Sequence, residues 1–376
     1  MLKKHLTGPV AIILLWISVN AVLYSRYGIK VVSDTDRYIE YAHGLMSGFY
    51  FDSHNFWYIG YGLYLAMIFK SGGGMVAVVA GQYVLSLIAT LALYRASFLL
   101  WNSRIGAFVT CCLFLLFIDI SQWNSYVLTE SIYTSFICFS IYCLASIHKG
   151  ERRWWFLVVS SFVIFITILI KPTGVALLGA LVVVLVRRNV PAILVTSVLF
   201  CLLINRMLTT YLVIENYRVG EIIYAVTTYP DQSKVRGLVI EPPADLYVPP
   251  ASHPPVVRIA AFVAHHPVYW TDLFLHKIFR LLVHTRPFWS MSHNLFSIAV
   301  LLVSYASFIF AIRNKAIHSD VVIFAITFLL IHILSVGITS DDWDGRFLIP
   351  MLPVIFICSG NGLTTWRNRN STHQLS

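Results

Sequence analysis

Long apolar runs separated by short polar connections dominate the hydropathy pattern of this chain. Runs of about 17 to 25 residues can cross the hydrocarbon core of a bilayer as single helices, and the pattern predicts about ten of them. We place them near residues 8–25, 75–99, 104–120, 128–147, 154–170, 173–188, 190–208, 294–312, 320–338 and 346–364. The pattern therefore predicts an all-α polytopic membrane protein, with residues 1–376 forming one integral membrane domain.

Two polar segments, residues 26–74 and 209–293, are much longer than the other connections. In the first, apolar residues recur at helical spacing after Ser33, which predicts an amphipathic helix of about four turns at the membrane surface. In the second, residues 256–266 and 268–284 each have helical periodicity. The later helix has the aromatic, aliphatic and basic pattern of an interfacial helix. Packing against the protein itself gives the same periodicity, so both interpretations stay open.

Composition supports the membrane assignment. The chain is 58% hydrophobic and 12% charged, whereas soluble domains carry about 25% charged residues. All six cysteines lie within apolar runs and are expected to be core residues. The net charge of +10 does not indicate nucleic-acid binding, because the basic residues form short clusters between the apolar runs.

These basic clusters predict the orientation of the chain. If Lys3 and Lys4 are cytoplasmic, alternate short connections carry the other basic clusters on the same side, as the positive-inside rule requires. Of the 17 acidic residues, only Glu151 and Asp320 then fall on the cytoplasmic side. Residues 26–74 and 209–293 lie outside in this topology. The cytoplasmic connections are too short for a nucleotide-binding domain, so the chemistry is expected on the outer face.

Two carboxylates and an arginine lie close together in Ser33-Asp34-Thr35-Asp36-Arg37-Tyr38, just after the first apolar run. Ser33 and Asp36 have the spacing of a capping box. At 100° per residue, Asp34 and Asp36 diverge by about 200°, so one small site cannot use both. Asp34 shares a helical face with Arg37 and Tyr38. We expect Asp34 to be the working carboxylate and Asp36 to be a cap or a supporting group.

Other charged residues lie at the outer ends of the predicted spans. Glu130 opens the span 128–147; the alternative role of this pair is structural, with Thr129 as the helix cap and Glu130 in the first turn. Lys171 lies outside between two spans, and Arg346 precedes the last one, with Asp344 as a possible restraint. Each of these two cations either snorkels to the interface or binds a phosphate.

Four motifs together resemble the GT-C glycosyltransferases, in the branch of protein O-mannosyltransferases and aminoarabinose transferases. The stretch from Asp34 to Gly48 is similar to the Asp-Glu-x-x-Tyr-x-x-x-Ala signature of that superfamily. The later motifs are Leu128-Thr129-Glu130-Ser131, Lys171-Pro172-Thr173-Gly174 and Arg346-Phe347-Leu348-Ile349-Pro350-x-x-Pro353. They span most of the chain, in the expected order and on the expected side. Thr35 departs from the signature, which has Glu at that position.

The resemblance implies transfer of a sugar from a polyprenyl-phosphate donor to a glycan, lipid or protein acceptor. The site would face the periplasm or exterior from a plasma membrane, the inner membrane in a bacterium. Asp34 would take the acceptor proton, with inversion at the sugar. Lys171, Arg346 and Arg37 would stabilise the departing phosphate. Asp36, Tyr38 and Glu130 would support the site or bind donor and acceptor. No cofactor is expected, and a divalent metal ion at Asp34 and Asp36 is not favoured.

Two other functions remain open. A transporter of lipid-linked sugar would place ionisable groups near the middle of its spans, whereas the acids here gather at the outer ends. A polymerase or ligase of surface polysaccharide shares the lipid-linked substrate. It would depend on arginines of the second long segment, such as Arg218, Arg236 and Arg258, more than on Asp34.

Overall fold

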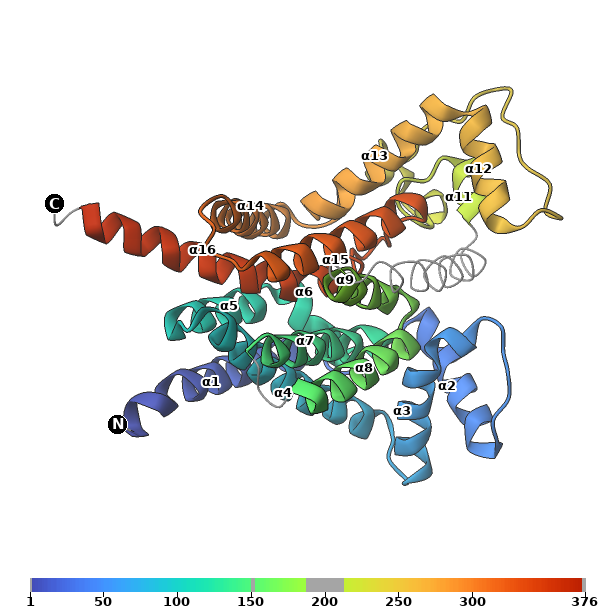
Figure 1. Ribbon diagram of the computed structural model, residues 1–376. Helices are drawn as coiled ribbons and strands as arrows, with labels where there is room; N and C mark the ends of the chain where they lie inside the picture. Colours follow the sequence, from blue (N-terminus) through green and yellow to red (C-terminus); the bar gives the residue numbers. More distant parts are fainter. Residues whose placement is uncertain (1, 150–152, 187–212, 374–376) are drawn as a thin grey trace. The chain divides into compact units, whose positions relative to one another are not determined.

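The computed structural model describes residues 2–149, 153–186 and 213–373 (Figure 1). Within these ranges the regular structure is helical, and strand pairing is limited to three isolated bridges. This agrees with the predicted all-α fold.

Six described helices are long and apolar enough to cross a membrane. They are α1 (Leu2–Tyr27), α4 (Met75–Trp101), α7 (Thr129–His148), α14 (Met291–Arg313), α15 (Ser319–Ile338) and α16 (Leu352–His373). Each corresponds to a predicted span. The architecture is therefore that of a polytopic helical membrane protein.

Three of the four remaining predicted spans, 104–120, 154–170 and 173–188, are not single long helices in the structure. The run 104–120 is broken, because α5 (Arg104–Leu116) and the following residues Ile118–Ser125 are bent by 67° and count at most as a seventh span. Helices α8 (Arg153–Ile170) and α9 (Val175–Val186) contain apolar stretches shorter than 18 residues. The run 190–208 lies outside the described residues. The predicted count of about ten spans is thus not reached among the described helices.

The described contacts group into two compact units. Unit 1 comprises Met1–Leu177, Leu302–Val322 and Leu352–Ser376, and unit 2 comprises Leu178–Leu301 and Ile323–Met351. Unit 1 carries Asp34, Glu130 and Lys171, whereas unit 2 carries Arg346. The residues that the sequence proposed for one site therefore belong to two separate units.

In unit 1, the first long polar segment folds into two helices joined by a short 3₁₀ turn. Helix α2 (Ser33–Ser47) confirms the predicted amphipathic helix. Helix α3 (Ile59–Lys70) was not predicted, and it follows the turn η1 (Asn55–Tyr58). A Cβ atom on Gly62 would lie 2.8 Å from the Tyr41 ring, so the glycine allows α2 and α3 to pack closely.

In unit 2, the second long polar segment has a hydrophobic core of its own. Residues of α11 (Val213–Val219), α12 (Pro255–His265) and α13 (Pro267–Val283) contribute to one buried cluster. Both helices predicted at 256–266 and 268–284 are present. One face of α13 is buried, through residues such as Leu273 and Leu281, which confirms packing against the protein. Another face exposes Leu275 and Phe279, as an interfacial helix would.

Candidate functional site

The start of α2 is fixed against the segment that precedes α7. Lys30 donates its backbone N–H to the carbonyl of Ser125 at 2.9 Å, and Val127 donates to the carbonyl of Lys30 at 3.0 Å. The buried Thr35 hydroxyl donates to the carbonyl of Val127 at 3.1 Å. These bonds bring the charged residues of α2 to the end of α7 that carries Glu130.

The predicted capping box of α2 is wrong. Val32 is the N-cap residue, and its N–H donates to the hydroxyl of Thr35 at 3.0 Å. Ser33 is already helical, and Asp36 is exposed. The hydroxyl of Thr35 takes over this role because it faces the protein interior, where it also bonds to Val127. Thr35 is therefore a structural contact at the start of α2.

Asp34, Arg37 and Tyr38 share one face of α2, as predicted from helical spacing. The carboxylate of Asp34 lies 3.6 Å from the guanidinium of Arg37, and these side chains are 35% and 27% exposed. The Arg37 guanidinium also donates to the side-chain oxygen of Asn55 at 3.4 Å. It lies 4.7 Å from the ring centroid of Tyr38 and 5.2 Å from that of Tyr58. Asp34 is thus a partly solvent-accessible carboxylate held beside a cation.

Tyr38, on the same face of α2 as Asp34 and Arg37, is buried. Burial raises the pKa of its hydroxyl well above the usual value, and the negative charges of Glu130 and Asp34 act in the same direction, whereas Arg37 lowers it. Tyr38 therefore remains a neutral phenol at any physiological pH. The charges of both Asp34 and Glu130 act on the Tyr38 hydroxyl, so the two acids lie on the same side of unit 1 near Tyr38.

Glu130 and Lys171 form a buried ion pair. The Lys171 ammonium donates to Glu130 Oε1 at 2.6 Å, and the two side chains are 4% and 2% exposed. The N-cap of α7 is Leu128, so capping by Thr129 is wrong; its hydroxyl donates instead to Glu130 Oε2 at 3.2 Å. Snorkelling of Lys171 is also wrong, because its ammonium points to a buried carboxylate.

Short turns hold Lys171 in this position. It directly follows α8, where its N–H donates to the carbonyl of Thr167 at 3.1 Å. The turn η3 (Pro172–Gly174) comes next, and the hydroxyl of Thr173 bonds to that of Tyr133 at 3.0 Å. A Cβ atom on Gly60 would lie 3.0 Å from the backbone at the end of α8, so glycine permits close approach of α3. The arrangement makes Arg37 the more exposed cation of the site.

Arg346, in unit 2, binds neighbouring aspartates. Its Nε donates to Asp342 Oδ2 at 2.9 Å, and Nη2 bonds to the same oxygen. The predicted restraint by Asp344 is also present, with Nε 3.8 Å from Oδ1. The side chain is 17% exposed. Arg346 is therefore largely buried and neutralised by a near neighbour in sequence.

A fully buried arginine beside this pair was missed by the sequence analysis. Arg286 Nη2 donates to Asp341 Oδ2 at 2.5 Å and to the carbonyl of Asp342 at 2.9 Å. Its Nε donates to the carbonyl of Trp343 at 3.3 Å, and both charged side chains are 0% exposed. The signal was the excess of acids in Asp341-Asp342-Trp343-Asp344 over the single nearby cation Arg346.

Unit 2 also contains a fully buried lysine, which the sequence analysis treated only as part of an amphipathic helix. Lys277 on α13 donates to the carbonyl of Thr339 at 2.6 Å and lies 4.9 Å from the centroid of the Tyr217 ring. Burial lowers the pKa of Lys277 from 10.5 to about 7, and the negative charge of Glu221 opposes this shift only in part. The Lys277 ammonium therefore loses its proton near neutral pH.

This pKa predicts a specific pH dependence of stability. Between pH 7 and 10 the unfolded chain keeps a proton on Lys277 that the folded chain has released, so stability should rise with pH by about 1.4 kcal/mol per unit. Lys277→Met removes this contribution. We expect the stability difference, variant minus parent, to be largest below pH 7 and to fall steadily toward pH 10. Thermal unfolding in detergent across this range tests it, and a constant difference would contradict a lowered pKa.

Comparison of the chain with protein-family models, curated proteins and solved structures finds no match.

Proposed function

We propose that this protein is a membrane glycosyltransferase that moves a sugar from a polyprenyl-phosphate donor to an acceptor hydroxyl. The observation that carries the proposal is the group on α2, where the partly exposed carboxylate of Asp34 lies 3.6 Å from the Arg37 guanidinium. A base and a cation side by side are what such a transfer needs. The buried phenol of Tyr38 adds a neutral hydrogen-bond donor.

The reaction assigns a separate task to each charge. The acceptor oxygen attacks the anomeric carbon, and its proton passes to the carboxylate of Asp34. The bond from that carbon to the lipid phosphate breaks, and the phosphate leaves with the electron pair. Attack opposite the leaving group inverts the sugar configuration. Arg37 stabilises the negative charge that develops on the phosphate.

The buried contacts change the choice of phosphate-binding cation. Lys171 is neutralised by Glu130, and Arg346 is neutralised by Asp342. We therefore assign the phosphate to Arg37 first, with Lys171 and Glu130 supporting the site from the protein interior. Asp36, which is exposed, is assigned no part in the chemistry.

We propose that this site faces the outer side of a plasma membrane, the bacterial inner membrane where the cell is a bacterium; the basic clusters of the connections support this orientation. Partners in the proposal are the lipid-linked donor, a glycan, lipid or protein acceptor, and the bilayer. We propose no metal ion at Asp34, because helical geometry directs Asp36 away from it.

Mass spectrometry of surface glycans and lipids from cells with and without the intact gene tests the proposal. We expect one glycosyl increment to disappear from an acceptor when the gene is deleted and to return with the restored chain. Unchanged acceptors would overturn the proposal. Accumulation of a sugar-linked lipid on the inner leaflet would also overturn it, in favour of a transporter.

A further inference from the structure

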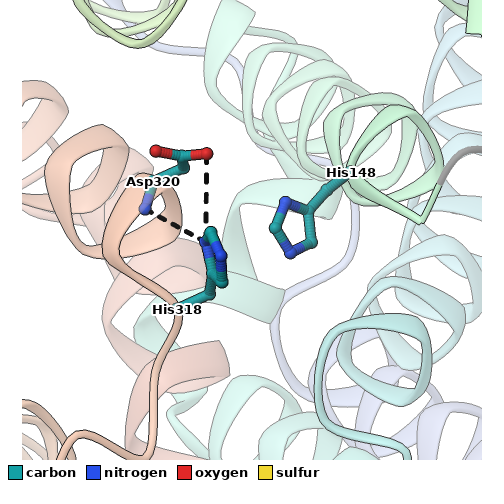
Figure 2. Close-up of side chains that lie close together, drawn as sticks. All are labelled: His148, His318 and Asp320. Carbon is teal, nitrogen blue, oxygen red and sulfur yellow. Dashed lines mark hydrogen bonds and ion pairs between the residues drawn. The ribbon is translucent and has the colours of Figure 1, made fainter. Parts of the chain in front are cut away.

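Three side chains with metal-binding chemistry meet within unit 1, away from the α2 site. His148 ends α7, His318 directly precedes α15 and Asp320 is the second residue of α15. One ligand atom from each lies within 4.8 Å of the other two. Figure 2 shows the three side chains close together, with His148 coming from α7 and the other two from the segment at which α15 begins.

The contacts within this group hold the donors close together. The rings of His148 and His318 have centroids 4.7 Å apart and are inclined at 60°. The N–H of Asp320 donates to His318 Nδ1 at 3.3 Å, and Oδ2 of Asp320 lies 3.9 Å from the same nitrogen (Figure 2). The histidines are exposed and Asp320 is partly buried.

We propose that His148, His318 and Asp320 bind a first-row divalent cation of the zinc type. Two imidazoles and one carboxylate suit Zn²⁺ and similar transition metals, whereas Mg²⁺ and Ca²⁺ prefer oxygen ligands. Ligands about 2.0–2.2 Å from a tetrahedral ion lie roughly 3.4 Å from one another. Because the histidines are exposed, small side-chain rotations bring the donors to this spacing. A water molecule would complete the ion's coordination.

Helix α7 separates this group from the candidate sugar site. Its 20 residues extend about 30 Å. Glu130 lies at the first turn of the helix and His148 at its last residue. The cation therefore takes no part in the transfer reaction. It joins the end of α7 to the start of α15, and the basic residues nearby predict that this end is cytoplasmic.

Charged residues near the three ligands both favour and oppose the binding of a cation. Asp320 supplies one negative charge, and it is one of only two acids that the topology places on the cytoplasmic side. Lys149 follows His148 and repels a cation there, but it is exposed, so water weakens this repulsion. A bound cation would neutralise the negative charge of the partly buried Asp320. Binding would thus link two helices whose ends are far apart in the sequence.

Zinc binding to the full chain, purified in detergent without a histidine tag and stripped with a chelator, tests the proposal. We expect calorimetry and elemental analysis to find one Zn²⁺ per chain, and a rise in Tm with added Zn²⁺. His148→Ala and His318→Ala should each weaken binding at least tenfold, since even groups that only orient a ligand matter by about that factor.

His276→Ala is the matched control. His276 pairs with Asp272 at 3.0 Å on the exposed side of α13 and has no place in this group, so this variant should bind Zn²⁺ like the parent chain. The Tm of each variant without Zn²⁺ shows that it is folded. Absence of saturable binding in the parent, or full affinity in both His148→Ala and His318→Ala, would overturn the proposal. Asp34→Asn should keep the site, which separates this test from that of the sugar transfer.

Discussion

Asp34→Asn is expected to lower sugar transfer in membranes by about 10²- to 10⁴-fold, the usual contribution of a positioned general base. Asparagine has nearly the same size as aspartate but cannot take a proton from the acceptor hydroxyl. The side chain is 35% exposed and its ion pair with Arg37 is long, at 3.6 Å. The substitution should therefore leave folding intact. Transfer from a labelled polyprenyl-phosphate sugar, normalised to the abundance of the protein, gives the measurement.

Asp36→Asn is the matched control for this experiment. Asp36 is two residues away on the same helix, is exposed, and points away from Asp34 by helical geometry. We expect it to keep at least half of the parent activity. Full activity in Asp34→Asn would remove this residue as the base. Equal losses in the two variants would indicate an electrostatic effect of the whole helix start, not proton transfer at Asp34.

Arg286→Met is expected to lower the free energy of unfolding by about 3–5 kcal/mol, the range seen when a buried ion pair loses one partner. Asp341 is 0% exposed and would keep a negative charge without the guanidinium that lies 2.5 Å away. Four backbone carbonyls, those of Arg280, Thr285, Asp342 and Trp343, would each also lose a hydrogen bond from the guanidinium. Thermal or denaturant unfolding of the purified chain in detergent measures the loss.

An exposed pair in the same unit provides the comparison. Arg218 lies 3.5 Å from Glu215, and these side chains are 62% and 48% exposed. Arg218→Met should therefore cost less than about 1 kcal/mol. Adding Asp341→Asn to Arg286→Met should restore part of the lost stability, because the uncompensated charge is then removed. A loss in Arg286→Met no larger than in Arg218→Met would show that the buried pair does not stabilise unit 2.

Hydropathy predicted the long helices well, because a helix that crosses a bilayer needs an apolar run of a certain length whatever it packs against. The hydropathy prediction failed where tertiary packing determines the backbone conformation. The run 104–120 is broken near Phe117, where the backbone leaves the helical region, and no proline marks the break. Helix α3 was overlooked because its 12 residues are too few for a span and include Gly60 and Gly62, which suggest a turn in isolation.

For the candidate site too, the sequence predicted the local arrangement but not the contacts between distant residues. The common face of Asp34, Arg37 and Tyr38 followed from spacing, since side chains three and four positions apart on a helix are neighbours. The partner of Lys171 did not, because Glu130 is 41 residues away. Arg286 and Asp341 are 55 residues apart, and each looked like an ordinary charge near an apolar run.

The sequence by itself predicted a membrane protein with many helices and the helix that carries Asp34, and the structure agrees with both. The orientation read from the basic residues stays a prediction. These are properties of neighbouring residues and of composition. Only the tertiary structure showed that Glu130 neutralises Lys171 and that Arg286 is buried against Asp341. It also brought His148 to His318 and Asp320. Such pairings depend on how distant helices pack, because a buried charge must find its partner wherever the fold brings one within reach.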